Sequence, residues 1–130
     1  MFRCFRFEEN LVLTLPTSDI DEREVEVFFD REEIDAVLCV NELFAVQCMS
    51  VVQNKGLRIP EDIAFIGFTD GFLSKYSNPA LTTVAQHGDK MGAIAAKMLI
   101  ERVEAELEPE KPYRTEVVEA TIVKRQSTAN

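Results

Sequence analysis

Two short apolar runs, residues 36–40 and 63–68, are each followed at once by a polar pair, and a helix-like segment separates them. A strand, a helix and a second strand in this order favour parallel pairing, because the helix crosses back over the sheet. The carboxyl ends of parallel strands meet at one edge, where open α/β sheets bind their ligands. The sequence therefore predicts that the polar pairs 41–42 and 69–70 share one edge of a sheet.

The rest of the chain continues this alternation. Strands are expected at 10–15, 36–40, 63–68, 82–84 and 116–123, and helices at 21–31, 42–55, 71–76 and 89–106. The order predicts an α/β fold, a three-layer open and mostly parallel sheet with helices on both faces. The uninterrupted apolar run 36–40 is typical of a strand covered on both faces. Ala95, Leu99 and Val103 recur every four residues and predict one apolar face on the last helix.

Composition and charge exclude several classes of protein. The chain of 130 residues fits one domain, and no apolar run approaches the roughly 18 residues that a membrane span needs. Residues 1–9 carry charges where a signal peptide needs an apolar stretch, so we expect a cytoplasmic protein. The net charge of −9 opposes direct contact with DNA, which requires clustered Lys and Arg.

The sequence predicts no metal site, no cofactor and no enzymatic activity. The chain has three cysteines, Cys4, Cys39 and Cys48. Their odd number, their wide spacing and the lack of a C-x-x-C pair favour buried free thiols over a disulfide or a zinc site. His87 is the only histidine and has no identifiable nucleophilic partner. The acidic residues between positions 19 and 24 fit the start of a helix better than a metal cluster.

Four polar residues are candidates for binding a small molecule. Asn41, Thr69 and Asp70 follow two neighbouring strands, and Gln86 follows the short strand 82–84. Amide, hydroxyl and carboxylate groups together donate and accept hydrogen bonds, as a polyhydroxylated ligand requires. The alternative is that Asn41 and Asp70 cap helices, a role compatible with ligand contact through a second lone pair.

Five segments carry a resemblance to a known family. They are DAVLCVNELFA (35–45), GLRIPEDI (56–63), IGFTD (66–70), LTTVAQ (81–86) and MGAIAA (91–96). In order and spacing they resemble the C-terminal part of the lactose-repressor (LacI) family of bacterial transcription regulators. The resemblance covers residues 34–128 and leaves 1–33 as a less regular lead-in to the same single domain.

Members of this family have an N-terminal helix-turn-helix, a hinge helix and a periplasmic-binding-protein-like core of two α/β subdomains. A small effector, often a sugar or a nucleobase, binds between the subdomains and acts allosterically on DNA binding. The resemblance implies that this chain is the C-terminal subdomain of a homodimeric regulator. Its sequence lacks the helix-turn-helix and the N-terminal subdomain, so DNA would be contacted only through an absent domain. We therefore expect weak or undetectable effector binding by the isolated chain.

The resemblance also assigns roles to single positions. Asn41, Thr69 and Gln86 match effector-binding positions, and Asp70 adjoins them. Thr69 stands where the family usually has the first Asp of Gly-Phe-Asp-Asp, which weakens the expectation of a simple sugar and leaves a sugar or a related metabolite. Val46 and Tyr76 are expected at the homodimer interface. Core packing of Val46 and loop anchoring by Tyr76 are the alternatives.

Two other functions fit the same predicted sheet. A solute-binding protein of a transport system would share the fold but would need export. A small flavodoxin-like enzyme would need a phosphate-binding loop after the first strand, yet residues 16–19, Pro-Thr-Ser-Asp, are not Gly-rich and end in a carboxylate.

Overall fold

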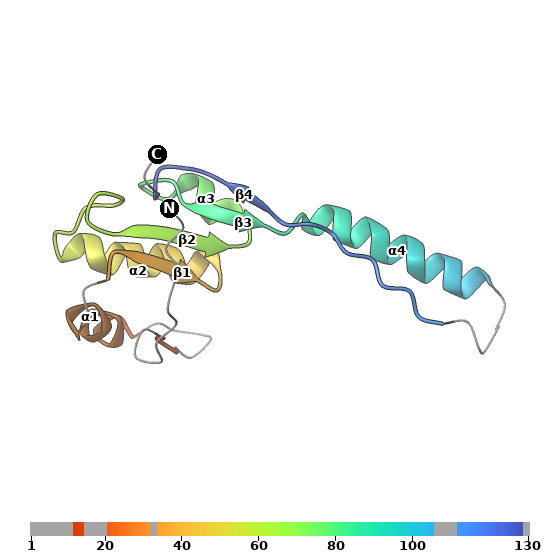
Figure 1. Ribbon diagram of the computed structural model, residues 1–130, viewed down its shortest axis with the longest axis horizontal. Coiled ribbons are helices and arrows are strands. Elements are labelled where there is room, and N and C mark those ends of the chain that lie inside the picture. The colour runs from red at the N-terminus through yellow and green to blue at the C-terminus, as the bar shows by residue number, and fades with distance from the viewer. Residues whose placement is uncertain (1–11, 15–20, 32–33, 106–111, 129–130) are drawn as a thin grey trace, which may run out of the picture.

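A computed structural model describes residues 12–14, 21–31, 34–105 and 112–128. Its elements are, in chain order, α1 (Glu22–Arg31), β1 (Ala36–Cys39), α2 (Glu42–Asn54), β2 (Ala64–Phe68), α3 (Phe72–Tyr76), β3 (Thr82–Ala85), α4 (Gly88–Glu104) and β4 (Thr121–Val123) (Figure 1). The four predicted helices are therefore confirmed, with ends close to those expected. Of the predicted strand 10–15, only residues 12–14 are described, and they form no strand.

The four strands form one sheet in the order β1-β2-β3-β4. β1, β2 and β3 run parallel, whereas β4 runs antiparallel to β3. The register places Cys39 opposite Gly67 and Phe68 opposite Val84. The predicted fold class, an open and mostly parallel α/β sheet with helices, is confirmed.

α2 begins and ends where local chemistry favours it. The Oδ1 atom of Asn41 accepts a hydrogen bond from the backbone N–H of Phe44 at 2.9 Å, which caps the first turn. Gly56, with φ of +84°, follows the last turn in the left-handed conformation that a Gly adopts without steric cost. Between these ends, Ala45, Met49 and Val52 are buried in the core.

The core lies between α1, α2 and one face of the sheet. Val37, Cys39 and Phe65 belong to that face, and Phe29 of α1 packs against Phe65 with 6.3 Å between ring centroids. Side chains alternate along a strand, so Leu38 points to the opposite face and is 68% exposed. The expectation that the run 36–40 is covered on both faces is therefore wrong in the described part of the chain.

α4 extends away from the sheet, and residues 112–120 return alongside it to β4 (Figure 1). None of the α4 residues is buried. Leu99 and Val103 of the predicted apolar face are 64% and 72% exposed. The four-residue spacing thus produces the expected helix, but within the described residues its apolar face has no core to pack against.

The C-terminal segment joins β2 to β3 through Ser127, which is fully buried. Its Oγ atom donates to the carbonyl of Phe65 at 2.6 Å and accepts from the backbone N–H of Thr82 at 2.8 Å. Its own backbone N–H and carbonyl bond to Ala80 and Phe65. Ser127 therefore satisfies buried backbone groups of two strands at once.

Arg125 fixes the same segment to the end of β2. Its guanidinium donates to the Asp70 carboxylate at 2.6 Å and to the carbonyl of Leu81 at 2.8 Å, and the Thr83 hydroxyl donates to the same Asp70 oxygen at 2.9 Å. Burial of Asp70 raises its pKa, but the hydrogen bonds from Arg125 and Thr83 outweigh burial and hold the pKa below its usual value.

We predict that Ser127→Ala lowers the free energy of unfolding by about 2 kcal/mol, because Thr82 N–H and the Phe65 carbonyl lose their buried partner. Urea unfolding followed by circular dichroism measures the change. The control is Ser50→Ala on the exposed side of α2, which we expect to shift stability by less than about 0.5 kcal/mol. Equal effects of the two substitutions would contradict this role of Ser127.

A second prediction concerns acid stability. Because the folded-state pKa of Asp70 lies below its unfolded-state value, the ionised carboxylate stabilises the fold above about pH 4. That contribution is lost as the pH falls through the folded-state pKa. Asp70→Asn should therefore destabilise the protein by about 2 kcal/mol at pH 7 and progressively less below pH 4. Urea unfolding between pH 7 and pH 3 tests this, with the exposed Asp35→Asn as control. A destabilisation independent of pH would refute it.

Candidate functional site

The polar pairs that follow β1 and β2 do lie at one edge of the sheet. β1 and β2 are parallel and pair Cys39 with Gly67. Asn41 and Thr69 each follow their paired residue by two positions, so both emerge at the carboxyl edge. The predicted shared edge is confirmed, whereas the ligand contacts of these residues remain a prediction.

Asn41 is half-buried and extended, with φ of −155°, at the start of α2. Its Oδ1 atom accepts the capping hydrogen bond from Phe44, so the capping interpretation is confirmed for this residue. The cap uses only the oxygen of the amide. The Nδ2 group of Asn41 therefore keeps its capacity to donate at the sheet edge.

Thr69 and Gln86 are brought together from the ends of β2 and β3. The Thr69 hydroxyl donates to Oε1 of Gln86 at 3.1 Å, and the Thr69 backbone N–H donates to the carbonyl of Val84 at 3.0 Å. Thr69 has φ of +76°, an uncommon conformation for a β-branched residue. Such backbone strain persists where the surrounding structure imposes it, and it concentrates at functional sites.

Asp70 is held differently from these three residues. Its Oδ1 atom accepts hydrogen bonds from Arg125 and Thr83, so this oxygen is occupied within the fold. α3 has Gly71 at its N-cap and no side-chain capping bond, so the alternative that Asp70 caps a helix is wrong. The sequence reveals no partner for Asp70, because Arg125 lies 55 residues away.

Glu42 has a role that the sequence analysis missed. Its Oε2 atom accepts hydrogen bonds from the backbone N–H of Ser74 at 3.0 Å and from the Ser74 hydroxyl at 2.6 Å. The carboxylate lies close to Gly71, where a Cβ atom would come within 2.6 Å of Glu42 Cδ. A Gly immediately before a short helix was the one sequence signal of such a close approach.

The two described cysteines, Cys39 and Cys48, are hydrogen-bonded to each other. Cys39 and Cys48 are buried free thiols, as predicted, whereas Cys4 lies outside the described residues. Hydrogen bonding to Cys48, together with burial, raises the pKa of the Cys39 thiol. Cys39 therefore remains protonated at neutral pH and is a poor nucleophile.

The residues predicted for dimerisation lie away from the core. Tyr76 is 73% exposed and contacts the ring of Phe72, itself 72% exposed, with 4.6 Å between ring centroids and a tilt of 38° between the planes. Val46 on α2 is half-buried. Tyr76 therefore does not anchor its loop by burial.

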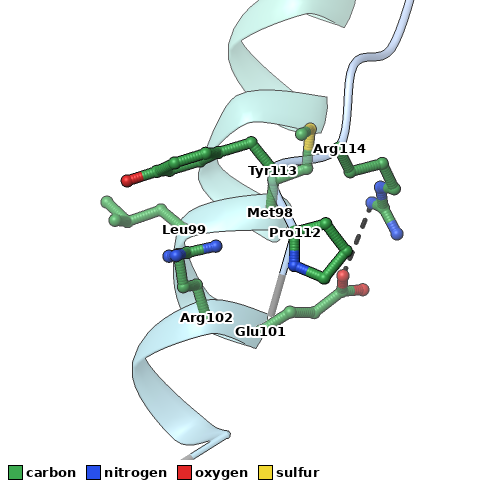
Figure 2. A pocket seen from close by; sticks show the side chains of 7 residues that line it. All are labelled: Met98, Leu99, Glu101, Arg102, Pro112, Tyr113 and Arg114. Carbon is green, nitrogen blue, oxygen red and sulfur yellow. Dashed lines mark ion pairs between the residues drawn. The ribbon is translucent and has the colours of Figure 1, made fainter. Parts of the chain in front are cut away.

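A groove on the α4 arm does not include any predicted site residue. It has a volume of about 280 Å³ and is lined by Met98, Leu99, Glu101, Arg102, Pro112, Tyr113 and Arg114 (Figure 2). The Arg102 guanidinium lies 4.5 Å from the Tyr113 ring centroid, and Arg114 pairs with Glu101 at 3.5 Å. The charged and aromatic groups of the groove therefore already have partners within it.

Among the described residues, no helix is long and apolar enough to cross a membrane.

Comparison with known proteins agrees with the architecture. The model of the periplasmic binding protein-like domain family matches residues 8–128. The ribose operon repressor of Haemophilus influenzae is 37% identical over 92 residues, 71% of this chain and 27% of the repressor. The transcriptional repressor PurR of Vibrio atlanticus is 39% identical over 96 residues, 72% of this chain and 29% of PurR. The chain thus spans less than a third of the length of these curated relatives.

Solved structures show the same relationship. A LacI-type transcription regulator from Bifidobacterium animalis subsp. lactis superposes with a TM-score of 0.74 at 31% identity, covering 84% of this chain and 38% of the regulator. The regulator CelR in complex with cellobiose gives 0.78 at 28% identity, covering 94% and 37%. The chain therefore belongs to the periplasmic binding protein-like domain family, and it matches the C-terminal, effector-binding part of LacI-family regulators.

Proposed function

We propose that this chain is the effector-sensing and dimerisation part of a cytoplasmic LacI-type transcription regulator, without enzymatic activity. The observation that carries the proposal is the shared edge of β1, β2 and β3, where Asn41, Thr69 and Gln86 follow the strand ends and Thr69 bonds to Gln86. In open α/β sheets this edge is where ligands bind. Repressors among the relatives favour regulation over the alternatives of solute transport and flavodoxin-like catalysis.

The proposed effector is a sugar or a related metabolite. Asn41, Thr69 and Gln86 offer neutral amide and hydroxyl groups that can both donate and accept hydrogen bonds. CelR was solved with cellobiose, and a LacI-family regulator from Arthrobacter was solved with lactose, which supports this class. Because one Asp70 oxygen is held by Arg125 and Thr83, we assign most of the hydroxyl recognition to the three neutral residues and a minor contact to Asp70.

Regulation would proceed by population shift between two arrangements of a two-subdomain core. An effector changes such an equilibrium only through different contacts in the two arrangements. The edge described here supplies one side of those contacts. DNA would be bound by a separate domain, since the net charge of −9 disfavours phosphate contacts by this part.

The homodimer is proposed to form through Tyr76 with its neighbour Phe72, and through Val46 on α2. Exposed aromatic side chains are enriched in protein interfaces because they bury a large area with few rotatable bonds. The Phe72–Tyr76 pair is such a surface, with both rings more than 70% exposed.

To test the effector site, residues 34–128 replace the matching part of the Haemophilus influenzae ribose operon repressor. Calorimetric titration with ribose, cellobiose, lactose and purine bases then identifies the effector class. We expect Asn41→Asp, which keeps the capping oxygen, and Thr69→Val each to weaken binding about tenfold, the equivalent of about 1.4 kcal/mol for a lost hydrogen bond.

The control for this titration is Thr115→Val, an exposed substitution on the return segment, which should leave the affinity unchanged. The isolated chain of 130 residues should show no tight binding, since it offers one side of the cleft only. A tight, stoichiometric titration of the isolated chain, or a chimera indifferent to both edge substitutions, would contradict the proposed site.

We predict that Tyr76→Ala raises the dimer dissociation constant of the chain at least tenfold, because truncation removes a large apolar contact from the proposed interface. Sedimentation equilibrium measures the constant. Tyr113→Ala is the matched control, since Tyr113 is 88% exposed but lies on the return segment beside α4. Equal dissociation constants for Tyr76→Ala and the unaltered chain would place the interface elsewhere.

A further inference from the structure

Glu42 joins the first turn of α2 to the first turn of α3, 32 residues further along the chain. Its Oε2 atom accepts both the backbone N–H and the hydroxyl of Ser74. Hydrogen bonds to an ionised acceptor are stronger than those between neutral groups. Ser74 is fully buried, so its N–H and hydroxyl depend on this partner rather than on water.

The fold makes room for this carboxylate at Gly71. A Cβ atom there would lie 2.6 Å from Cδ and 2.8 Å from Oε2 of Glu42, closer than non-bonded atoms approach. Gly71 therefore admits the Glu42 carboxylate just after the end of β2.

At the other end of α3, the backbone N–H of Leu81 donates to the Ser74 carbonyl at 2.8 Å, so Glu42 is the anchor of the first turn. α3 is a five-residue helix without a side-chain capping bond of its own. Phe72, Leu73 and Tyr76 on it are exposed. The buried member of the helix is Ser74, the residue that Glu42 binds.

We propose that Glu42 is a positioning residue, which holds α3 and its Phe72–Tyr76 pair in a fixed place relative to the strand ends that carry Asn41 and Thr69. Glu42 follows Asn41 directly, and α3 follows Thr69 within three residues. One carboxylate thus connects the candidate effector edge with the candidate dimer surface. This inference rests on the proposed function for the meaning of those two surfaces.

The experiment uses the full chain with Glu42→Ala, Glu42→Gln and Gly71→Ala. Amide hydrogen exchange of Ser77, whose N–H donates to the Leu73 carbonyl inside α3, reports the order of the helix without direct contact to Glu42. We expect exchange at least tenfold faster in Glu42→Ala. Glu42→Gln should be intermediate, because its amide oxygen still accepts from Ser74. Gly71→Ala should resemble Glu42→Ala, because the new methyl group displaces the carboxylate.

Two further readouts separate positioning from general destabilisation. Exchange of the Phe65 amide in the sheet should stay within twofold of the unaltered chain in all variants, as should every readout in the control Glu61→Ala. The dimer dissociation constant should rise moderately in Glu42→Gln and further in Glu42→Ala. If Glu42→Ala does not fold, Gly71→Ala with the same readouts decides the question.

Ser77 exchange unchanged in Glu42→Ala or in Gly71→Ala would overturn the positioning role. So would faster exchange without a change in dimerisation, if Tyr76→Ala does weaken the dimer. If Tyr76→Ala has no effect, the proposed dimer surface fails instead. Ser77 exchange would then still decide whether Glu42 positions α3. Loss of protection in Glu42→Ala and its partial recovery in Glu42→Gln would be the supporting result.

Discussion

Parallel pairing of β1 with β2 is the constraint on which the candidate site depends. The register that sets Cys39 opposite Gly67 brings the residues after both strands to one edge. A shift by one residue would turn alternate side chains to the other face and would move Phe65 out of the core. Because Phe65 is fully buried against α1 and α2, the hydrophobic core that stabilises the sheet also fixes the position of Asn41 relative to Thr69.

Contacts distant in sequence hold β2 and β3 together at both of their ends. Arg125 and Ser127 come from the C-terminal segment, yet they bind the end of β2 and the starts of β2 and β3. By occupying one oxygen of Asp70, Arg125 leaves neutral groups as the main exposed chemistry of the edge. Arg125, which lies outside the candidate site, thus offsets the charge of Asp70.

The helices and the parallel strands could be predicted from local patterns, because caps, glycines and apolar periodicity act over a few residues. Asn41 and Gly56 bracket α2 as their chemistry requires. The side-chain partners could not be predicted in the same way. Arg125 and Asp70 are 55 residues apart and Glu42 and Ser74 are 32 apart, and nothing in the local sequence specifies either pairing. The exposed faces of β1 and α4 escaped prediction because burial depends on what packs against an element, which its own sequence does not determine.

The geometry of the edge is the reason we expect one subdomain to be a poor receptor by itself. Thr69 and Gln86 already bond to each other, and the Asn41 oxygen already caps α2. A ligand that binds Thr69 and Gln86 as proposed would compete with their mutual bond and with water, so each new hydrogen bond would gain little free energy. Small-molecule sites usually bury most of the ligand surface, which a single sheet edge cannot do. A second subdomain that covers the ligand would exclude water and strengthen the same polar contacts, and this difference is what would let the effector favour the closed arrangement.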